Sequence, residues 1–442
     1  MTGGHGTSGA WSARHILYEL RGGFLLLPMA VAIVIVLLGI ALVALEQNSS
    51  AVASWASTFM WTVPREAGVA QGLLATIAGA IMTVLSVVYS VLLLVLTFAS
   101  IQFSPRIIVT FMRDRINQVT LGMFLGSFTH CLATLPRVHD RNTEFIPTMA
   151  VSFAILLAIV SLGCLVLFVH NMALSLQVNS IVSRIAADTL QVLAEVCAPV
   201  ASIAREPTGG DSERFVLASD HSGYIQFFDR RALVAAADRA DAVIRMHRGI
   251  GQFVIKGTAI ATVEGGTRGK LPLSRAIARA IQYGPVRTLE DDVEFGVLQL
   301  VDIGLKAVSP AVNDPSTAIL CVDYLGEILA AAAGARDPKS EIPGERGSLR
   351  LVIPTWTFAR LLDIAFDQLP RYARADVAVS LRILRALLDV ASCAASQDHR
   401  EAIYKRAQFV HDLCVRHAPD DELAALRERL ERVRSATSSP AC

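Results

Sequence analysis

Four long runs of apolar residues in the first part of the chain constrain its fold more than any other feature. A helix needs about 20 apolar residues to cross the hydrocarbon core of a bilayer. The runs reach this length without an interior charge, and we expect membrane-spanning helices at about residues 23–45, 68–103, 117–136 and 146–173. At about 1.5 Å per residue the second run exceeds the thickness of a bilayer core, so its helix should tilt or project beyond the membrane.

The charges that flank these runs predict orientation, because cytoplasmic loops of membrane proteins are enriched in Lys and Arg. Arginines precede the first run, separate the second from the third and follow the fourth, at Arg14, Arg21, Arg106, Arg113, Arg115 and Arg184. The other two loops are nearly balanced in charge, with Glu46 counted in the first of them. We therefore expect a multi-pass protein of the cell inner (plasma) membrane, with the N- and C-termini in the cytoplasm.

The remaining composition argues against several classes of protein. The 442 residues carry a formal net charge of +1 and no basic tail or stripe, which gives nucleic-acid binding little support. None of the seven cysteines forms a C-x-x-C pair, and no histidine stands at metal-ligand spacing from them. We predict reduced core or membrane thiols, no bound metal and no cofactor.

The second run carries small and hydroxyl side chains at helical spacing. These residues follow one another at steps of three, four and seven, so they share one face of a helix. They are Thr76, Gly79, Thr83, Ser86, Ser90, Thr97 and Ser100. One interpretation is helix packing, because small residues let backbones approach and hydroxyls bond across helices. The other is a pore in which the hydroxyl residues line a conducting path, with the apolar pair Leu93 and Leu94 as a constriction.

Ionisable residues in and beside the runs offer few further candidates. Arg106, Arg113 and Arg115 would anchor against anionic lipid headgroups or, alternatively, take a binding role. His130 lies near the outer end of the third run, where we expect it to be neutral and hydrogen-bonded. The third run also holds a G-x-x-x-G pair starting at Gly122, a signal of close helix packing. The runs contain no Asp, Glu, Lys or Arg, which argues more against an ion-coupled transporter than against a channel.

The fold class predicted for the whole chain is a four-span α-helical membrane domain, residues 1–175, followed by a cytoplasmic α+β region. Residues 176–212 should form a connecting helix and linker, residues 213–288 a β-rich domain and residues 289–442 a helical bundle. In the β-rich part, "GIGQFVIKGTAIATV" at 249–263 resembles the barrel-sandwich of lipoyl and biotinyl domains. The lysine-bearing hairpin of those carriers is missing, so we expect a structural adaptor without a swinging arm.

The stretch "SPAVNDPSTA" at 309–318 is the most distinctive polar segment of the helical part. Pro310 should end one helix, and Asp314 should cap the next with Pro315 in its first turn. Asn313 tolerates the left-handed conformation of such a turn. The alternative is a contact with a ligand or another subunit, with the candidates Asp302, Lys306, Ser309, Asn313, Asp314, Ser316 and Thr317.

Three stretches together resemble an uncharacterised bacterial family of four-span membrane proteins, domain of unknown function 2254. They are "FSPRIIVTFMRDR", "HSGYIQFFD" with its Gly-rich continuation, and "DDVEFGVLQLVDIGLKAVSPAVNDPSTA", the most specific of the three. The resemblance extends from about residue 14 to about residue 430. It implies four spans and a cytoplasmic C-terminal domain, and it brings no activity or catalytic residue with it.

Two functions stay open at the level of the sequence. The first is a homo-oligomeric ion channel or pore, lined by the second run, gated by the cytoplasmic domain and embedded in membrane lipid. The second is a membrane-anchored sensor or scaffold whose cytoplasmic domain binds a small ligand or a protein. No nucleophile–base pair, metal cluster or phosphate loop points to catalysis, so we do not expect an enzyme.

Overall fold

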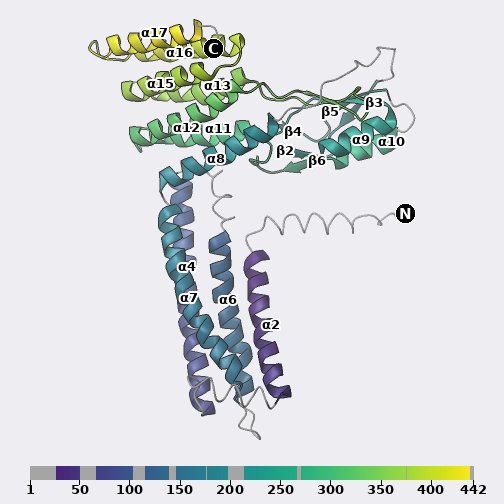
Figure 1. The fold of residues 1–442 in the computed structure, drawn as a ribbon, viewed down its shortest axis with the longest axis vertical. Coiled ribbons are helices and arrows are strands. Elements are labelled where there is room, and N and C mark those ends of the chain that lie inside the picture. Colours follow the sequence, from purple (N-terminus) through teal and green to yellow (C-terminus); the bar gives the residue numbers. More distant parts are fainter. Residues whose placement is uncertain are drawn as a thin grey trace. The chain divides into compact units, whose positions relative to one another are not determined.

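The computed structural model describes residues 26–49, 66–102, 115–138, 146–175, 177–197, 214–265, 270–374 and 376–438. The chain divides into an N-terminal unit, residues 1–177, and a C-terminal unit, residues 178–442 (Figure 1). Five described helices are long and apolar enough to cross a membrane. Four of them lie in the N-terminal unit, and they are α2 (Leu26–Asn48), α4 (Ala67–Gln102), α6 (Arg115–Thr134) and α7 (Thr148–Ser175). These four helices follow the apolar runs of the sequence closely.

Helix α6 is the centre of the N-terminal unit. It contacts α2, α4 and α7, and it lies between α2 and the α4–α7 pair (Figure 1). Its mean hydropathy of 1.3 is the lowest of the four, against 2.5 to 3.0 for the others, and half of its apolar window is buried compared with 28% in each neighbour. The central position explains how the least apolar helix is accommodated, because its polar groups face other helices. A short 3₁₀ turn, η2 (Leu135–Val138), follows it.

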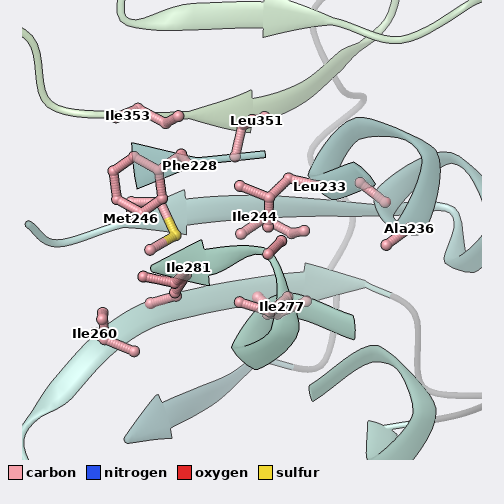
Figure 2. Packing of buried hydrophobic residues seen from close by; sticks show 14 of the residues in the cluster. Phe228, Leu233, Ala236, Ile244, Met246, Ile260, Ile277, Ile281, Leu351 and Ile353 are labelled. Atoms are coloured by element: carbon pink, nitrogen blue, oxygen red, sulfur yellow. The ribbon is translucent and has the colours of Figure 1, made fainter. Parts of the chain in front are cut away.

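The C-terminal unit opens with α8 (Val178–Val196) and continues into two sheets and two helices around one core. The five-stranded sheet has the order β1-β5-β3-β8-β7, and the three-stranded sheet has the order β4-β2-β6. The strands are β1 (Arg214–Ala218), β2 (Gly223–Phe228), β3 (Ala242–Met246), β4 (Phe253–Val254), β5 (Ala259–Gly265), β6 (Ile281–Gly284), β7 (Glu341–Pro343) and β8 (Leu349–Val352). The helices are α9 (Arg230–Ala240) and α10 (Lys270–Arg279). Figure 2 shows how strands and helices both contribute to this core.

The expected barrel-sandwich is not confirmed in this part of the chain. Residues 249–263 supply β4 to the three-stranded sheet and β5 to the five-stranded sheet. Helices α9 and α10 contribute side chains to the core that both sheets share. Strand β8 joins in parallel to β3, with Ile244 opposite Leu351. Both β7 and β8 come from the stretch expected to be helical. Strand β8 belongs to the sheet because Leu349 and Leu351 alternate with more exposed residues and need an apolar core to cover them. Strand β7 joins the sheet by pairing with β8.

Helices from residue 293 onward stack in successive layers on α8 (Figure 1). They are α11 (Val293–Ala307), α12 (Pro315–Gly334), α13 (Phe358–Phe366), α14 (Gln368–Tyr372), α15 (Val377–Cys393), α16 (Gln397–Val415) and α17 (Leu423–Ser438). The fifth apolar helix, α12, is enclosed by α8, α11, α13 and α15. A Cβ on Gly326 would lie 3.0 Å from Cβ of Ala386 on α15, so these two helices approach closely. Helix α12 is therefore the core helix of this unit, which accounts for its apolar composition.

Candidate functional site

The polar side of α4 lies on the outside of the N-terminal unit. We define the hydroxyl face by Thr76, Thr83, Ser86, Ser90 and Thr97, all of which are exposed. Each hydroxyl donates a hydrogen bond to the carbonyl four residues earlier, at 2.7–2.9 Å. The buried residues of α4 lie on the opposite side of the helix and include Ala78, Leu85 and Leu92. The hydroxyl face therefore points away from the helices that pack on α4.

The exposed surfaces of the neighbouring helices differ in chemistry from this face. Helix α2 exposes Val34 to 63% and helix α7 exposes Ile159 to 65%, and both surfaces are made of large aliphatic side chains. The hydroxyl face instead offers oxygens whose protons are already engaged, so their lone pairs remain as acceptors. Leu93 and Leu94 interrupt it, both exposed, where the sequence shows the apolar gap.

The other residues predicted near the end of α4 are only partly described. Arg106 and Arg113 lie outside the described residues, as does the side chain of Ser100. Arg115 is the first residue of α6 and is exposed. Contacts of these arginines with lipid headgroups stay a prediction.

Close packing of α6 on α2 confirms the meaning of the glycine pair. A Cβ on Gly122 would lie 2.8 Å from Cβ of Val31. A Cβ on Gly126 would lie 2.6 Å from Cδ1 of Ile35 and 3.1 Å from Cα of Ala32. Both glycines thus permit a helix approach that any side chain would obstruct.

Polar pairs inside the N-terminal unit were not predicted from the sequence. Oγ atoms of Ser127 on α6 and Ser161 on α7 lie 3.2 Å apart, and Asn171 Nδ2 donates to Asn117 Oδ1 at 3.3 Å. The sequence signal that could have predicted these pairs is the set of polar residues in the third run. They recur at helical spacing, although the run is apolar enough to span a membrane. Such pairs satisfy polar groups that would otherwise face lipid.

Glu46 and His130 both bind backbone atoms in the first turn of α7. The position of Glu46 differs from the loop position that the sequence predicted. Glu46 belongs to α2 rather than to a loop, is only 4% exposed, and accepts hydrogen bonds from Thr148 N and Met149 N, both at 3.0 Å. It therefore caps a helix that begins 102 residues later, which no local pattern could indicate. His130 is buried on α6 with Nε2 3.0 Å from Ala150 O, in agreement with the expected hydrogen bond. A Cβ on Gly39 would lie 2.1 Å from His130 Nδ1, so this glycine makes room for the ring.

The segment between α11 and α12 is a capped turn. Asp314 is the N-cap of α12, accepting from Thr317 N at 3.1 Å and from Thr317 Oγ1 at 2.6 Å, with Pro315 as the first helical residue. Asn313 has φ of 48°, the left-handed conformation expected of it. The bonds from Thr317 lower the pKa of the Asp314 carboxyl. These local roles are confirmed, whereas a ligand or subunit contact stays a prediction.

The remaining candidates of that set are distributed over the end of α11 and the start of α12. Asp302 and Lys306 are half-buried on α11, and both take part in polar interactions. Ser309 Oγ donates to Lys306 O at 2.7 Å, which closes the last turn of α11. Ser316 is exposed. The hydroxyl of Ser309 is thus explained by helix termination, as that of Thr317 is by the cap.

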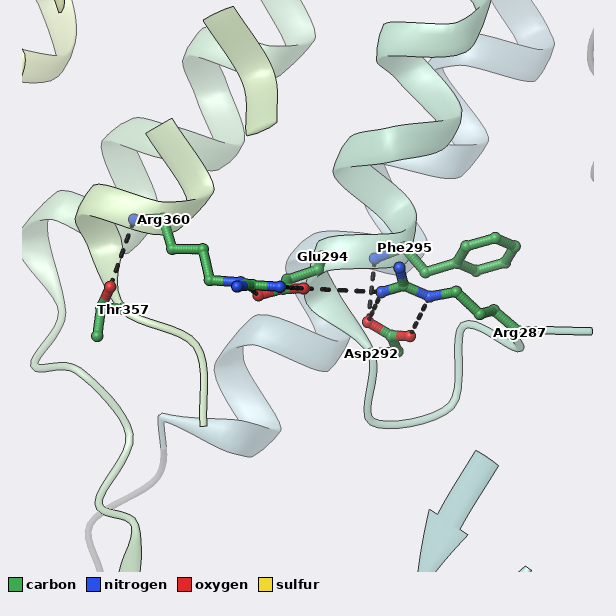
Figure 3. A network of polar contacts seen from close by, with 6 residues as sticks. All are labelled: Arg287, Asp292, Glu294, Phe295, Thr357 and Arg360. Carbon is green, nitrogen blue, oxygen red and sulfur yellow. Dashed lines mark hydrogen bonds and ion pairs between the residues drawn. The ribbon is translucent and has the colours of Figure 1, made fainter. Parts of the chain in front are cut away.

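A charged network at the start of α11 was not foreseen in full (Figure 3). Asp292 is the N-cap, accepting from Phe295 N at 3.0 Å, and Arg287 binds both its oxygens at 2.9 and 2.8 Å. Arg287 Nη2 lies 3.8 Å from Glu294, which pairs in turn with Arg360 on α13. Burial raises the pKa of the Asp292 carboxyl, and the hydrogen bonds from Arg287 oppose that rise. The sequence indicates acids in the first turn of this helix but not their partners.

This network joins the sheets to the helices within the C-terminal unit. Gly251, in the turn before β4, has φ of 77°, and a Cβ there would lie 2.2 Å from Asp292 Oδ2 and 2.6 Å from Arg287 Nη2. Only glycine fits a backbone that is both left-handed and in contact with an ion pair. The most specific motif of the sequence therefore has a structural role at this junction.

The possible metal ligands and the cysteines of the described residues are scattered over the chain. Within those parts, no group of three or more His, Cys, Asp or Glu side chains is arranged to hold a metal ion. Cys131, Cys164, Cys197, Cys321, Cys393 and Cys414 are free, and Cys393 is exposed rather than in a core. Burial raises the pKa of the Cys321 thiol to about 12, so that this residue stays protonated and unreactive.

A bundle of long apolar helices followed by an α+β unit is the architecture of a membrane protein with an additional globular region. The chain belongs to the family described as "Predicted membrane protein (DUF2254)", which it matches over residues 21–389. It is 30% identical to an uncharacterized protein of Mycobacterium tuberculosis and to one of Mycobacterium bovis, in each case over 81% of this chain and 71% of the relative. No solved structure matches it significantly.

Proposed function

We propose that the protein is a homo-oligomeric pore of the inner membrane, in which the hydroxyl faces of α4 from several copies surround a path for water or small cations. The observation that carries this proposal is the position of the hydroxyl face, on the outside of the N-terminal unit and opposite to the packed side of α4. An exposed polar face on a membrane helix is best accommodated by a neighbouring copy or an aqueous path, and symmetric oligomers are common.

The chemistry of the face supports a path for neutral or positively charged species. Its hydroxyl protons are held by carbonyls of α4, so the oxygens present lone pairs, as in pores that replace part of an ion's hydration shell. No charge lies among the five residues of the face, which favours passage without tight binding. The exposed pair Leu93 and Leu94 supplies an apolar ring that would close the path by dewetting.

The proposed topology has four spans, α2, α4, α6 and α7, with both termini in the cytoplasm. Arginines at the inner ends of the spans in this topology support the orientation, because cytoplasmic loops carry an excess of positive charge. Helix α12 meets the length criterion, but its enclosure by four other helices argues against a fifth span. In this arrangement the C-terminal unit is cytoplasmic and gates the path without catalysis.

Flux through proteoliposomes tests the proposal. Thr83→Val removes a hydroxyl of the face while keeping the side-chain volume, and Ser86→Leu fills the same region. The matched control is Thr129→Val on α6, because the Thr129 hydroxyl makes the same bond to the carbonyl four residues earlier, at 2.7 Å. We expect potassium or sodium flux in the wild type, a reduced flux in both α4 variants and an unchanged flux in the control.

Measuring the oligomeric state distinguishes the proposed pore from a membrane-anchored scaffold. Disulfide cross-linking between copies should form at Ser86→Cys and not at Leu162→Cys, which replaces an exposed aliphatic residue of α7. A monomer in detergent and in nanodiscs, together with no flux under voltage, tension or pH change, would refute the pore. Binding of a small molecule or protein to the C-terminal unit in such a protein would favour the scaffold.

A further inference from the structure

The three-stranded sheet and the residues next to its strands carry a group of apolar and aromatic side chains, of which Tyr224 is half-buried and the others are exposed. We call it the aromatic patch and define it by Tyr224, Phe227, Phe253, Ile255 and Val286. Phe253 is 52% exposed, Ile255 60% and Val286 50%, and the rings of Tyr224 and Phe253 meet edge to face at 5.1 Å. None of the five side chains carries a charge, which sets the patch apart from an ordinary solvated surface.

Strand geometry explains why these residues point outward. Phe253 and Ile255 flank the buried Val254, as alternation along an extended chain requires. In β2 a bulge between Ile225 and Phe227 shifts the register. Ile225 and Phe228 therefore both reach the core, and Tyr224 and Phe227 remain on the outer side. The patch is thus fixed by the same pairing that builds the core.

The C-terminal unit, which carries the patch, follows the last helix of the N-terminal unit after a short connection. Helix α7 ends at Ser175 and α8 starts at Val178, so the connection between the two helices is short. Helix α8 has 19 residues, which corresponds to about 28 Å at 1.5 Å per residue. Phe227 lines an open pocket together with Glu195 near the end of α8. The tether therefore keeps the patch within a few tens of ångströms of lipid, at a high effective concentration.

We propose that the aromatic patch docks onto the lipid interface of the membrane that holds the N-terminal unit. Aromatic side chains favour the headgroup region, where an apolar body and a polar tip are both accommodated, and Tyr224 supplies such a tip. Lys256, which is exposed and follows Ile255 in the chain, supplies a positive charge for lipid phosphates. The inference concerns the resting position of the C-terminal unit and does not depend on ion conduction.

Quenching by brominated lipid tests the docking in the full-length protein. Phe253→Trp places a fluorophore in the patch, and the control Val216→Trp places one on β1, where Val216 is 62% exposed on the other sheet. Each variant is reconstituted into vesicles of phosphatidylcholine and phosphatidylglycerol, with and without bromine on the acyl chains. The wild-type signal of the four native tryptophans is subtracted.

The expected result is a blue-shifted difference emission for Phe253→Trp that brominated lipid reduces by a larger fraction than for Val216→Trp. Equal quenching of both variants, or none, would overturn the proposal. A blue-shifted emission at position 253 that brominated lipid leaves unchanged would also overturn it, because a protein surface would then cover the patch. Phe253→Asp adds a second readout, since it should increase protease cleavage of the C-terminal unit in vesicles but not in detergent.

Discussion

Replacing Asp292 by Ala should destabilise the C-terminal unit far more than the loss of an ordinary helix cap. The change removes the N-cap bond to Phe295 N, which is worth about 1 kcal/mol. It also leaves the guanidinium of Arg287, which is only 16% exposed, without its two-point partner. Breaking a buried pair in this way costs about 3–5 kcal/mol. Because Glu294 remains 3.8 Å from Arg287, we expect the lower end, about 3 kcal/mol for the free energy of unfolding.

Thermal unfolding of the full-length protein in detergent, followed by circular dichroism, measures this effect. For a unit of this size about 1 kcal/mol lowers the melting temperature by about 2–4 °C, so Asp292→Ala should lower it by roughly 6–12 °C. The matched control is Asp376→Ala on α15, where Asp376 accepts from Val379 N at 3.1 Å and, in the described residues, forms no ion pair with arginine. The control should lose about 2–4 °C. Equal losses in the two variants would refute the reasoning about the network.

Three further predictions concern the helix contacts and caps. Gly126→Ala should weaken the α2–α6 contact by about 1–3 kcal/mol, seen as a lower melting temperature in detergent, whereas Gly163→Ala, where a Cβ meets open space, should not. Glu46→Ala should cost about 1–2 kcal/mol and speed hydrogen exchange of the Thr148 and Met149 amides, and an unchanged exchange would contradict its capping role. Asp314 has a lowered folded pKa, so its stabilisation is present at neutral pH and is lost as pH falls from about 4 through that pKa. Asp314→Asn should therefore flatten the acid side of the stability–pH profile, as denaturant unfolding at a series of pH values would measure.

The sequence by itself determined the elements that depend on neighbours along the chain. An uncharged run of about 20 apolar residues has few alternatives to a spanning or fully buried helix, so α2, α4, α6 and α7 were found close to their bounds. The turn before α12 could also be predicted from the sequence. Asn313, Asp314 and Pro315 favour it through their own backbone conformations and through hydrogen bonds to nearby residues. Local chemistry of this kind needs no partner from elsewhere.

Only the tertiary structure decided which faces and which distant residues meet. It placed the hydroxyl face of α4 outside its unit, Glu46 on the start of α7, and β8 beside β3. It also placed α12 in another unit than the four apolar helices α2, α4, α6 and α7, although its composition meets the same length and hydropathy criterion. The reason is physical: burial, ion pairing and strand pairing depend on three-dimensional neighbours separated by tens to more than a hundred residues, and apolar composition is the same in a bilayer and in a protein core.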